Sequence, residues 1–227
     1  MARTYVRDSR GRFAAHSSFS LSQPVLNEKT TIALENYMLK PGGISKILRR
    51  SPEAAAQDSL VNFSSEEYAR IKGDVNSSCK QIATIDKAMN ESHMNEATIL
   101  YRGIRSDTFA ESMKPGFSFV DKSFTSTSSS ASVAHDFADS SYRSGKKVIM
   151  EVEVPKGTRA LDLEKTQYGS NVMQQKEVLL DRGGHYKVKH VEDDGEYLHV
   201  RVELIEQSKG ESPKLTATFA QVRNFRD

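Results

Sequence analysis

The sequence predicts a mixed α+β protein in which a helical N-terminal part precedes a core of mostly antiparallel strands. Between residues 28 and 95, apolar residues recur every three or four positions, which is the period of an α-helix. From residue 96 onward the period changes to alternation, most clearly in Val148–Val154, and short turns rich in Gly and Pro separate the runs. We therefore expect four parts: a flexible basic arm at 1–27, a helical part at 28–95, a core at 96–207 and a C-terminal tail at 208–227.

Composition and charge are those of a globular protein. Of the 227 residues, 37% are hydrophobic and 27% are charged, and 32 Lys and Arg against 30 Asp and Glu leave a net charge of +2. So balanced a charge gives no argument for nucleic-acid binding on its own. The single cysteine, Cys79, excludes a disulfide within the chain and a zinc site built from cysteines, and its helical spacing predicts a small core residue. No run approaches the roughly 20 apolar residues of a membrane span, so no membrane partner is expected.

The N-terminal arm is rich in Arg and Ser and shows no periodicity. Its run Val6–Ala14 resembles the opening of many phage virion and prophage proteins. Because no apolar stretch follows its arginines, the arm is not a standard secretory signal, and we expect the protein in the cytoplasm of a bacterium or of a target cell.

Start and stop signals place the individual elements. In the helical part, a helix at Thr30–Leu39 should stop at Pro41-Gly42-Gly43, and further helices should start at Ser51-Pro52-Glu53 and at Ser64, whose capping box includes Glu67. In the core, helices are expected at Asp107–Met113, capped by Ser106, and from Ser129 or Ser130 to Tyr142. The expected strands are Thr98–Ile104, Phe117–Thr125, Val148–Val154, Ala160–Leu163, Glu177–Leu180, His185–Val191 and Tyr197–Leu204. The helical part either packs on the core or forms a separate cap domain.

Three short signals in the core carry candidate chemistry: Leu100-Tyr101-Arg102-Gly103, Phe124-Thr125-Ser126-Thr127-Ser128 and Gln175-Lys176-Glu177. A guanidinium in an apolar strand is costly unless it meets an anion, and the planar fork of Arg102 suits a phosphate or a carboxylate. Gly103 would let a ligand approach the backbone closely. A carboxylate at the mouth of a buried strand, as at Glu177, also needs a partner or a task. Residues two apart on a strand share a face, so Gln175 and Glu177 can serve one site.

The order of these signals resembles the Arg, Ser-Thr-Ser and Glu signature of one class of mono-ADP-ribosyltransferases. The closest resemblance is to the clostridial exoenzymes that modify Rho GTPases and to the enzymatic components of binary actin-modifying toxins. It covers residues 60–206 and includes further matching positions: Val133-Ala134, Phe137, Arg143, Val154-Pro155-Lys156-Gly157-Thr158 and Arg182-Gly183. The resemblance implies an ADP-ribosyltransferase fold with two mostly antiparallel sheets around an NAD cleft, NAD+ as co-substrate, no metal, and a macromolecular acceptor that is protein or nucleic acid. It further implies that the chain is a toxin, an effector or a phage-encoded modifier.

The resemblance also implies roles for individual residues. Arg102 grips the NAD phosphate, the backbone of Gly103 meets the nicotinamide amide, and Ser126 orders the site and holds the catalytic Glu177. Phe137 and Arg143 pack against nicotinamide and pair with phosphate. Tyr101 and Thr127 are expected in the cofactor site beside these residues. The acceptor-recognition residues are Tyr168, in the loop 166–176, and Gln175, which is also counted among the catalytic residues with Glu177, Ser126 and Arg102.

The acceptor is expected to depend on position 175. Within the resemblance, enzymes that modify arginine carry Glu two residues before the catalytic Glu, where a second carboxylate can pair with the guanidinium. A neutral amide such as Gln175 cannot pair with that charge but can hydrogen-bond an amide or a base edge. In the resemblance, Gln goes with Asn acceptors and with guanine in DNA. We therefore expect an acceptor other than Arg, with side-chain amide and nucleobase both open and the basic arm favouring nucleic acid slightly.

Two alternatives use the same residues differently. With water as acceptor the protein would be an NAD glycohydrolase, and without catalysis it would be a virion or interaction protein that keeps the fold. Nicotinamide leaves without a strong acid, so the histidines are expected to be surface or structural residues: His135, His185, His190 and His199. An inhibitory partner of the antitoxin, immunity-protein or chaperone type is left open.

Overall fold

The computed structural model describes residues 19–57, 65–140, 144–165 and 176–214. The chain divides into two compact units, one holding residues up to 25 together with 89–209, the other residues 26–88 and those from 210 onward. The first contains all the candidate chemistry. None of the described helices is long and apolar enough to cross a membrane.

The second unit is helical, as predicted. Its helices are α1 (Glu28–Leu39), α2 (Pro41–Arg49), α3 (Pro52–Gln57) and α4 (Ser65–Asn90). The start signal at Ser51 is confirmed, since its hydroxyl accepts a hydrogen bond from the Ala54 N–H at 3.0 Å. Pro41, expected only to stop a helix, also opens α2, because the first helical position needs no N–H donor. Cys79 is buried at 7% exposure, as predicted for a small core residue. Ser64 lies outside the described residues.

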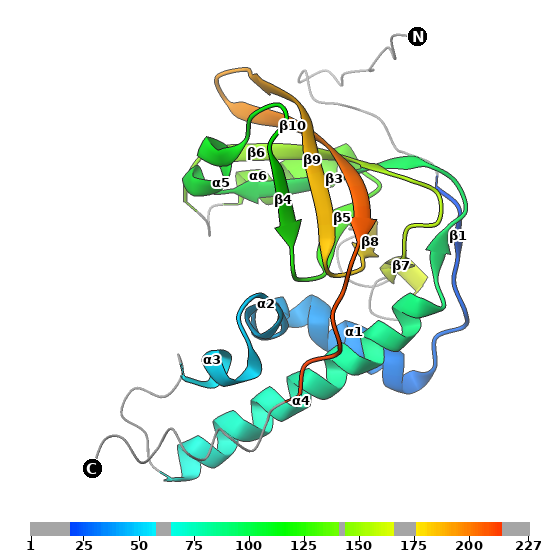
Figure 1. Ribbon diagram of the computed structural model, residues 1–227, viewed down its shortest axis with the longest axis vertical. Helices are drawn as coiled ribbons and strands as arrows, with labels where there is room; N and C mark the ends of the chain where they lie inside the picture. Colours follow the sequence, from blue (N-terminus) through cyan, green and yellow to red (C-terminus); the bar gives the residue numbers. More distant parts are fainter. Residues whose placement is uncertain (1–18, 58–64, 141–143, 166–175, 215–227) are drawn as a thin grey trace. The chain divides into compact units, whose positions relative to one another are not determined.

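The first unit is built on an eight-stranded sheet, drawn in Figure 1, with the strand order β4-β9-β10-β6-β3-β5-β8-β7. Its strands are β3 (Thr98–Arg105), β4 (Ser118–Asp121), β5 (Thr125–Ser128), β6 (Lys147–Val154), β7 (Ala160–Asp162), β8 (Glu177–Leu180), β9 (Gly184–Asp193) and β10 (Tyr197–Gln207). Only β10 and β6 pair in parallel among these described strands, so the mostly antiparallel α+β core is confirmed. The main apolar core includes Leu100, Val152, Val178, Tyr186 and Val202.

The connection through β5 differs from the prediction. One strand was expected at Phe117–Thr125, but the chain forms β4 and then β5, because the Asp121 carboxylate accepts a hydrogen bond from the Ser123 N–H at 3.0 Å and turns the chain. Strand β5, which carries the Ser-Thr-Ser triplet, pairs with β8 along four residues but with β3 only at Tyr101 and Ser128. The pairing between β3 and β5 is therefore the shortest in the described sheet, and it lies beside the candidate site.

Three short elements complete this unit: α5 (Asp107–Ser112), α6 (Ala131–Asp139) and the 3-10 turn Leu163–Lys165. Ser106 caps α5 as predicted, accepting from the Phe109 N–H at 3.2 Å. Helix α6 ends at Asp139 rather than Tyr142, because Ser140 has an extended ψ of 124°. Strand β1 (Leu21–Ser22), within the expected arm, pairs with β2 (His93–Met94), so the described end of the arm is bound to the core.

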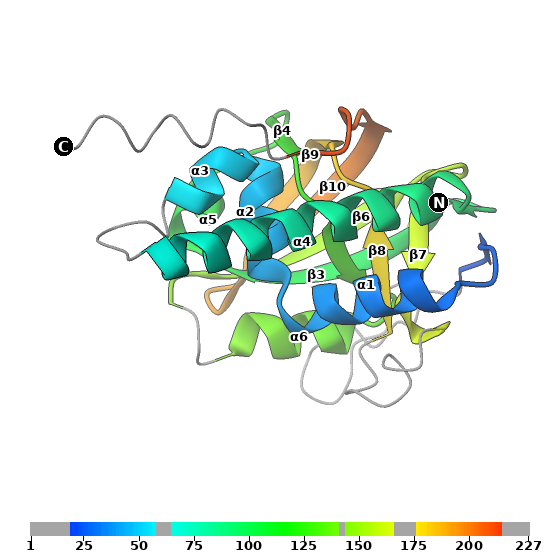
Figure 2. The ribbon, with the colours of Figure 1, turned by 90° about the horizontal axis from the view of Figure 1, so that it is seen from below.

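Helix α6 lies directly against β3, as Figure 2 shows. A Cβ atom built on Gly103 would overlap the Ala134 carbonyl oxygen and come within 2.8 Å of the Ala138 nitrogen. Both are backbone atoms and cannot rotate away, so the glycine is required by the contact between strand and helix.

We therefore expect Gly103→Ala to destabilise the protein by about 1–3 kcal/mol, because it overpacks a backbone contact. Urea unfolding measures the change. Gly73→Ala is the control: Gly73 is an exposed residue in α4 with no atom within 4 Å of an added Cβ. That substitution should stabilise by about 0.5–1 kcal/mol. Equal stability of Gly103→Ala and the parent chain would contradict the tight packing of α6 on β3.

Candidate active site

Ser126 and Glu177 come together through the register of β5 and β8. Glu177 is the first residue of β8 and lies opposite Ser128. Ser126, two residues earlier on β5, shares a face with Ser128 and therefore with Glu177. The Ser126 side chain hydrogen-bonds the Glu177 carboxylate across the diagonal. The predicted pairing of these two residues is thus present in the structure.

Arg102 reaches the same residue from the other side of β5. Its Nη1 donates a hydrogen bond to the Ser126 carbonyl oxygen at 3.2 Å. Its charge also acts on the Glu177 carboxylate. Ser126 therefore links the guanidinium to the carboxylate, with its backbone held by one and its hydroxyl bound to the other. A guanidinium has five N–H donors, so this contact is compatible with gripping a phosphate at the same time.

Burial raises the pKa of Glu177 above its ordinary value. The Ser126 hydrogen bond and the Arg102 charge lower the pKa, but they only partly offset the effect of burial. The Glu177 carboxylate is thus incompletely stabilised in the free protein. A cation placed beside such a carboxylate would stabilise its charged form. This property is expected of a residue that stabilises positive charge on a substrate.

Buried hydroxyl groups hold β5 in place next to the site. The Thr127 hydroxyl donates to the Val178 carbonyl oxygen at 2.6 Å, which fixes β5 to β8 next to Glu177. The Tyr186 hydroxyl donates to Thr125 Oγ1 at 3.1 Å, and burial raises the pKa of Tyr186 to about 12. Tyr186 was missed in the sequence because it looks like an ordinary strand residue, whereas Thr125 belongs to the hydroxyl-rich run that was singled out. Thr127, predicted in the cofactor site, is buried and uses its hydroxyl within the sheet.

Of the remaining predicted residues, the structure describes Tyr101 and Phe137. Tyr101 is buried against Ala131 and Ala134 of α6, whereas the Phe137 ring is 42% exposed on the same helix. Arg143, Tyr168 and Gln175 lie outside the described residues.

The backbone before Glu177 is not extended. Lys176 has φ 45°, the one positive φ at a non-glycine residue in the described chain, and its carbonyl accepts from the Ser129 N–H at 3.1 Å. Strand β8 begins only at Glu177. The extended backbone of β8 therefore does not include Lys176, and the expected pairing of Gln175 with Glu177 on one face lies outside the described residues.

The histidines predicted to be structural or on the surface divide between those two settings. His135 is buried in α6 at 2% exposure, whereas His190 is exposed. Among the described residues, no group of three or more His, Cys, Asp or Glu side chains could hold a metal ion.

Comparison with solved structures shows the same fold in several toxins. Plx2a, an ADP-ribosyltransferase toxin from Paenibacillus larvae, matches 80% of this chain and 88% of its own with 18% identity and a TM-score of 0.56. The Clostridium limosum C3 exoenzyme matches over 80% and 87%, with 18% identity and a TM-score of 0.54. C3stau2 from S. aureus, solved with NAD, matches over 80% and 88%, with 17% identity and a TM-score of 0.54. At these identities the likeness is one of fold.

No curated protein sequence matches the chain. The family model described as ADP-ribosyltransferase exoenzyme matches residues 23–210, which include every residue of the site described above. The mono-ADP-ribosyltransferase resemblance and the predicted fold are both confirmed by this match and by the toxin structures. The chain belongs to the ADP-ribosyltransferase exoenzyme family and is an NAD+ ADP-ribosyltransferase.

Proposed function

We propose that this chain cleaves the nicotinamide–ribose bond of NAD+ and transfers ADP-ribose to an acceptor other than arginine, either a protein Asn or Gln side chain or a nucleic-acid base. The observation that carries the proposal is the bond from Ser126 to the Glu177 carboxylate, with the Arg102 guanidinium held on the Ser126 backbone. Arg102, Ser126 and Glu177 lie far apart in the sequence, and these contacts connect them in the fold.

NAD+ supplies the leaving nicotinamide, and the departure of nicotinamide builds positive charge on the ribose. Glu177 is suited to stabilise that charge, because burial has removed much of the water that would otherwise solvate its carboxylate. Ser126 orients the carboxylate, so little reorganisation is needed when the charge develops. Arg102 offers a planar cation for the diphosphate. These properties fit an NAD+ site, and the neighbour C3stau2 was solved with NAD.

The acceptor class rests on Gln175. A neutral amide cannot pair with a guanidinium, but it can donate to and accept from a side-chain amide or the edge of a base. This chemistry supports an acceptor other than arginine and does not distinguish protein from nucleic acid.

Glu177→Gln should lower transfer from labelled NAD+ to lysate macromolecules by at least about a hundredfold, because it removes the charge that stabilises the transition state. Scintillation counting of precipitated material measures the transfer. Glu111→Gln, which changes an exposed carboxylate on α5, is the control and should label like the parent chain.

The same labelled material identifies the acceptor. Separate digestion with protease, RNase and DNase shows which treatment releases the label. Equal labelling by Glu177→Gln and the parent chain would contradict the proposed role of Glu177. Rapid release of free ADP-ribose with no labelled macromolecule would instead indicate an NAD glycohydrolase.

The raised pKa of Glu177 predicts opposite effects of pH on activity and on stability. Activity needs the charged form, so kcat/KM should fall with decreasing pH at a midpoint above the ordinary glutamate value of about 4.3. The folded state binds the proton more tightly than the unfolded state does, so Glu177 lowers the free energy of unfolding as pH rises through the same window. Glu177→Gln should therefore be more stable than the parent chain at pH 7 and equally stable below pH of about 4. Thermal unfolding across pH checks this. A stability difference that is the same at both ends would refute the shift.

The left-handed Lys176 sets how the chain enters β8. A side chain at positive φ costs about 1–2 kcal/mol, and this cost is held immediately before the proposed catalytic carboxylate. The Lys176 carbonyl also ties this point to Ser129, at the end of β5. We infer that this conformation fixes the start of β8 and therefore the position of Glu177.

Lys176→Val should destabilise the protein by about 1–3 kcal/mol relative to Lys176→Gly and should lower kcat, because a β-branched residue resists positive φ. Both substitutions remove the lysine side chain, so their difference isolates the backbone. Urea unfolding and turnover of NAD+ measure the two effects. Identical stability and kcat in the two variants would show that the conformation of Lys176 has no part in placing Glu177.

A further inference from the structure

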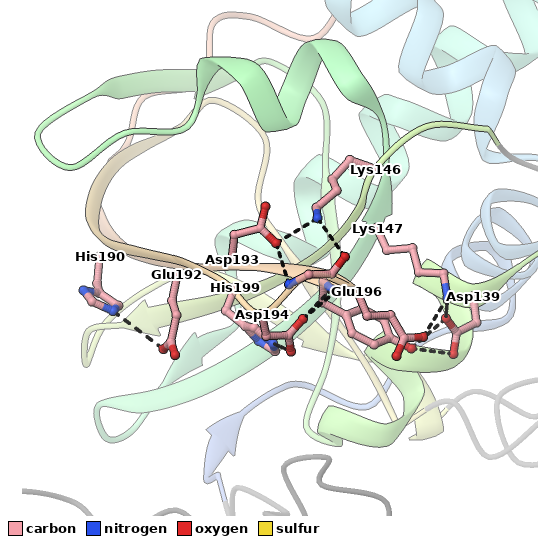
Figure 3. Close-up of polar contacts among 11 residues, drawn as sticks. Asp139, Lys146, Lys147, His190, Glu192, Asp193, Asp194, Glu196 and His199 are labelled. Atoms are coloured by element: carbon pink, nitrogen blue, oxygen red, sulfur yellow. Dashed lines mark hydrogen bonds and ion pairs between the residues drawn. The ribbon is translucent and has the colours of Figure 1, made fainter.

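A polar cluster at the C-terminal end of α6 lies outside the residues assigned so far. The Tyr197 hydroxyl, at the start of β10, donates to both carboxylate oxygens of Asp139, at 2.8 and 3.0 Å. Lys147, at the start of β6, makes ion pairs with Asp139 at 2.9 Å and with Glu196 at 3.0 Å. Figure 3 shows the contact of Lys147 with Asp139, the last residue of α6.

The Tyr197 contact is the strong part of this cluster. Surface ion pairs such as those of Lys147 contribute little on their own. Tyr197, in contrast, is 8% exposed, packs with Ala138 and Ile149, and meets the edge of the His135 ring at 4.8 Å between centroids. Burial and the bond to Asp139 raise the pKa of Tyr197, so the hydroxyl keeps its proton and donates. Burial opposes ionisation of Asp139, but the bonds from Lys147 and Tyr197 prevail and lower its pKa.

Arg105 holds the same end of the helix from the opposite side. Its Nη1 donates to the carbonyl oxygen of Ser140, the C-cap of α6, at 3.1 Å. Its Nε donates to the carbonyl oxygen of Gly145 at 3.1 Å, just before β6. A cation at a helix C-terminus satisfies carbonyl groups that have no partner within the helix. Arg105 is the last residue of β3, the strand that also carries Arg102.

Helix α6 needs such anchors because its buried face is small. Apart from His135, the residues it buries are alanines: Ala131, Ala134 and Ala138. Alanine side chains bury little apolar area, so their packing alone stabilises a nine-residue helix weakly. Phe137 lies two positions before Asp139 in the same helix, and this residue is 42% exposed. The position of this ring is therefore set largely by polar contacts made at the helix end.

We propose that Tyr197 and Arg105 are positioning residues for dinucleotide binding, which act by fixing the C-terminal end of α6 and with it the ring of Phe137. The helix starts directly after β5, whose Ser126 and Ser128 face Glu177, so its placement is coupled to the same site. The inference rests on the proposed function, because it assigns the exposed ring to contact with NAD+. It concerns binding of the co-substrate and not bond cleavage.

Calorimetric titration with NAD+ tests the proposal. Tyr197→Phe should raise Kd about three- to tenfold, which is the range for loss of one hydrogen bond. Arg105→Lys, which keeps the charge but cannot reach both carbonyls, should raise Kd by a similar factor. In both variants kcat should change less than KM. Thr158→Val is the control: it removes a buried hydroxyl that donates to Pro155 at 2.8 Å, remote in the sequence from α6, and should leave Kd unchanged.

A double variant separates positioning from general stability. If Tyr197 acts through Phe137, adding Tyr197→Phe to Phe137→Ala should change Kd by less than about twofold. The same rise in Kd in both backgrounds would overturn the proposal, and so would a wild-type Kd in both Tyr197→Phe and Arg105→Lys. Failure of the parent chain to bind NAD+ would overturn the proposed function together with this inference, whereas binding by the parent and by all variants alike would overturn this inference alone.

Discussion

The structure depends most on the two bonds that meet at Ser126. Strands β3 and β5 share a single residue pair, so the ladder alone holds Arg102 only loosely to the strand that faces Glu177. The Arg102 bond to the Ser126 carbonyl crosses this weak point, and the Ser126 hydroxyl continues the connection to the carboxylate. A serine is suited to this place because its backbone and its side chain can hold different partners. Arg102 therefore acts on the Glu177 carboxylate through its charge, while Ser126 makes hydrogen bonds with both residues.

The site also has two features that are unfavourable in free energy, and contacts in the surrounding sheet offset them. Burial disfavours the charged form of Glu177, and Lys176 holds a left-handed conformation beside it. The rest of β8 is well supported by its buried apolar residues Val178 and Leu180 and by the bond from the Thr127 hydroxyl to the Val178 carbonyl. Strain at one end of β8 is thus tolerated because the rest of the strand is fixed on both sides. If Glu177 acts as we propose, stability and activity place opposite demands on the same carboxylate.

Much of the fold could be read from the sequence because hydrophobic periodicity and caps are local signals. The alternation in β6, the Ser106 cap and the helical run around Cys79 all correspond to elements of the structure. The split between β4 and β5 was missed because it depends on one side-chain bond from Asp121 to the Ser123 backbone. The contacts of Tyr197 with Asp139 and of Arg105 with Ser140 join residues 58 and 35 positions apart and have no signature in the sequence. Gly103 had a signal, but its structural reason is the close approach of a helix.

The start of β8 sets the surroundings of Glu177, the proposed catalytic residue. Glu177 belongs to the ladder, where its pairing with Ser128 and its bond to Ser126 fix the carboxylate. Lys176, immediately before β8, has a positive φ of 45°, which interrupts the extended backbone there. A change at position 177 removes a partner of the Ser126 side chain. The sheet therefore constrains the residue to which we assign bond cleavage, because the backbone pairing with Ser128 and the side-chain bond to Ser126 both act on Glu177.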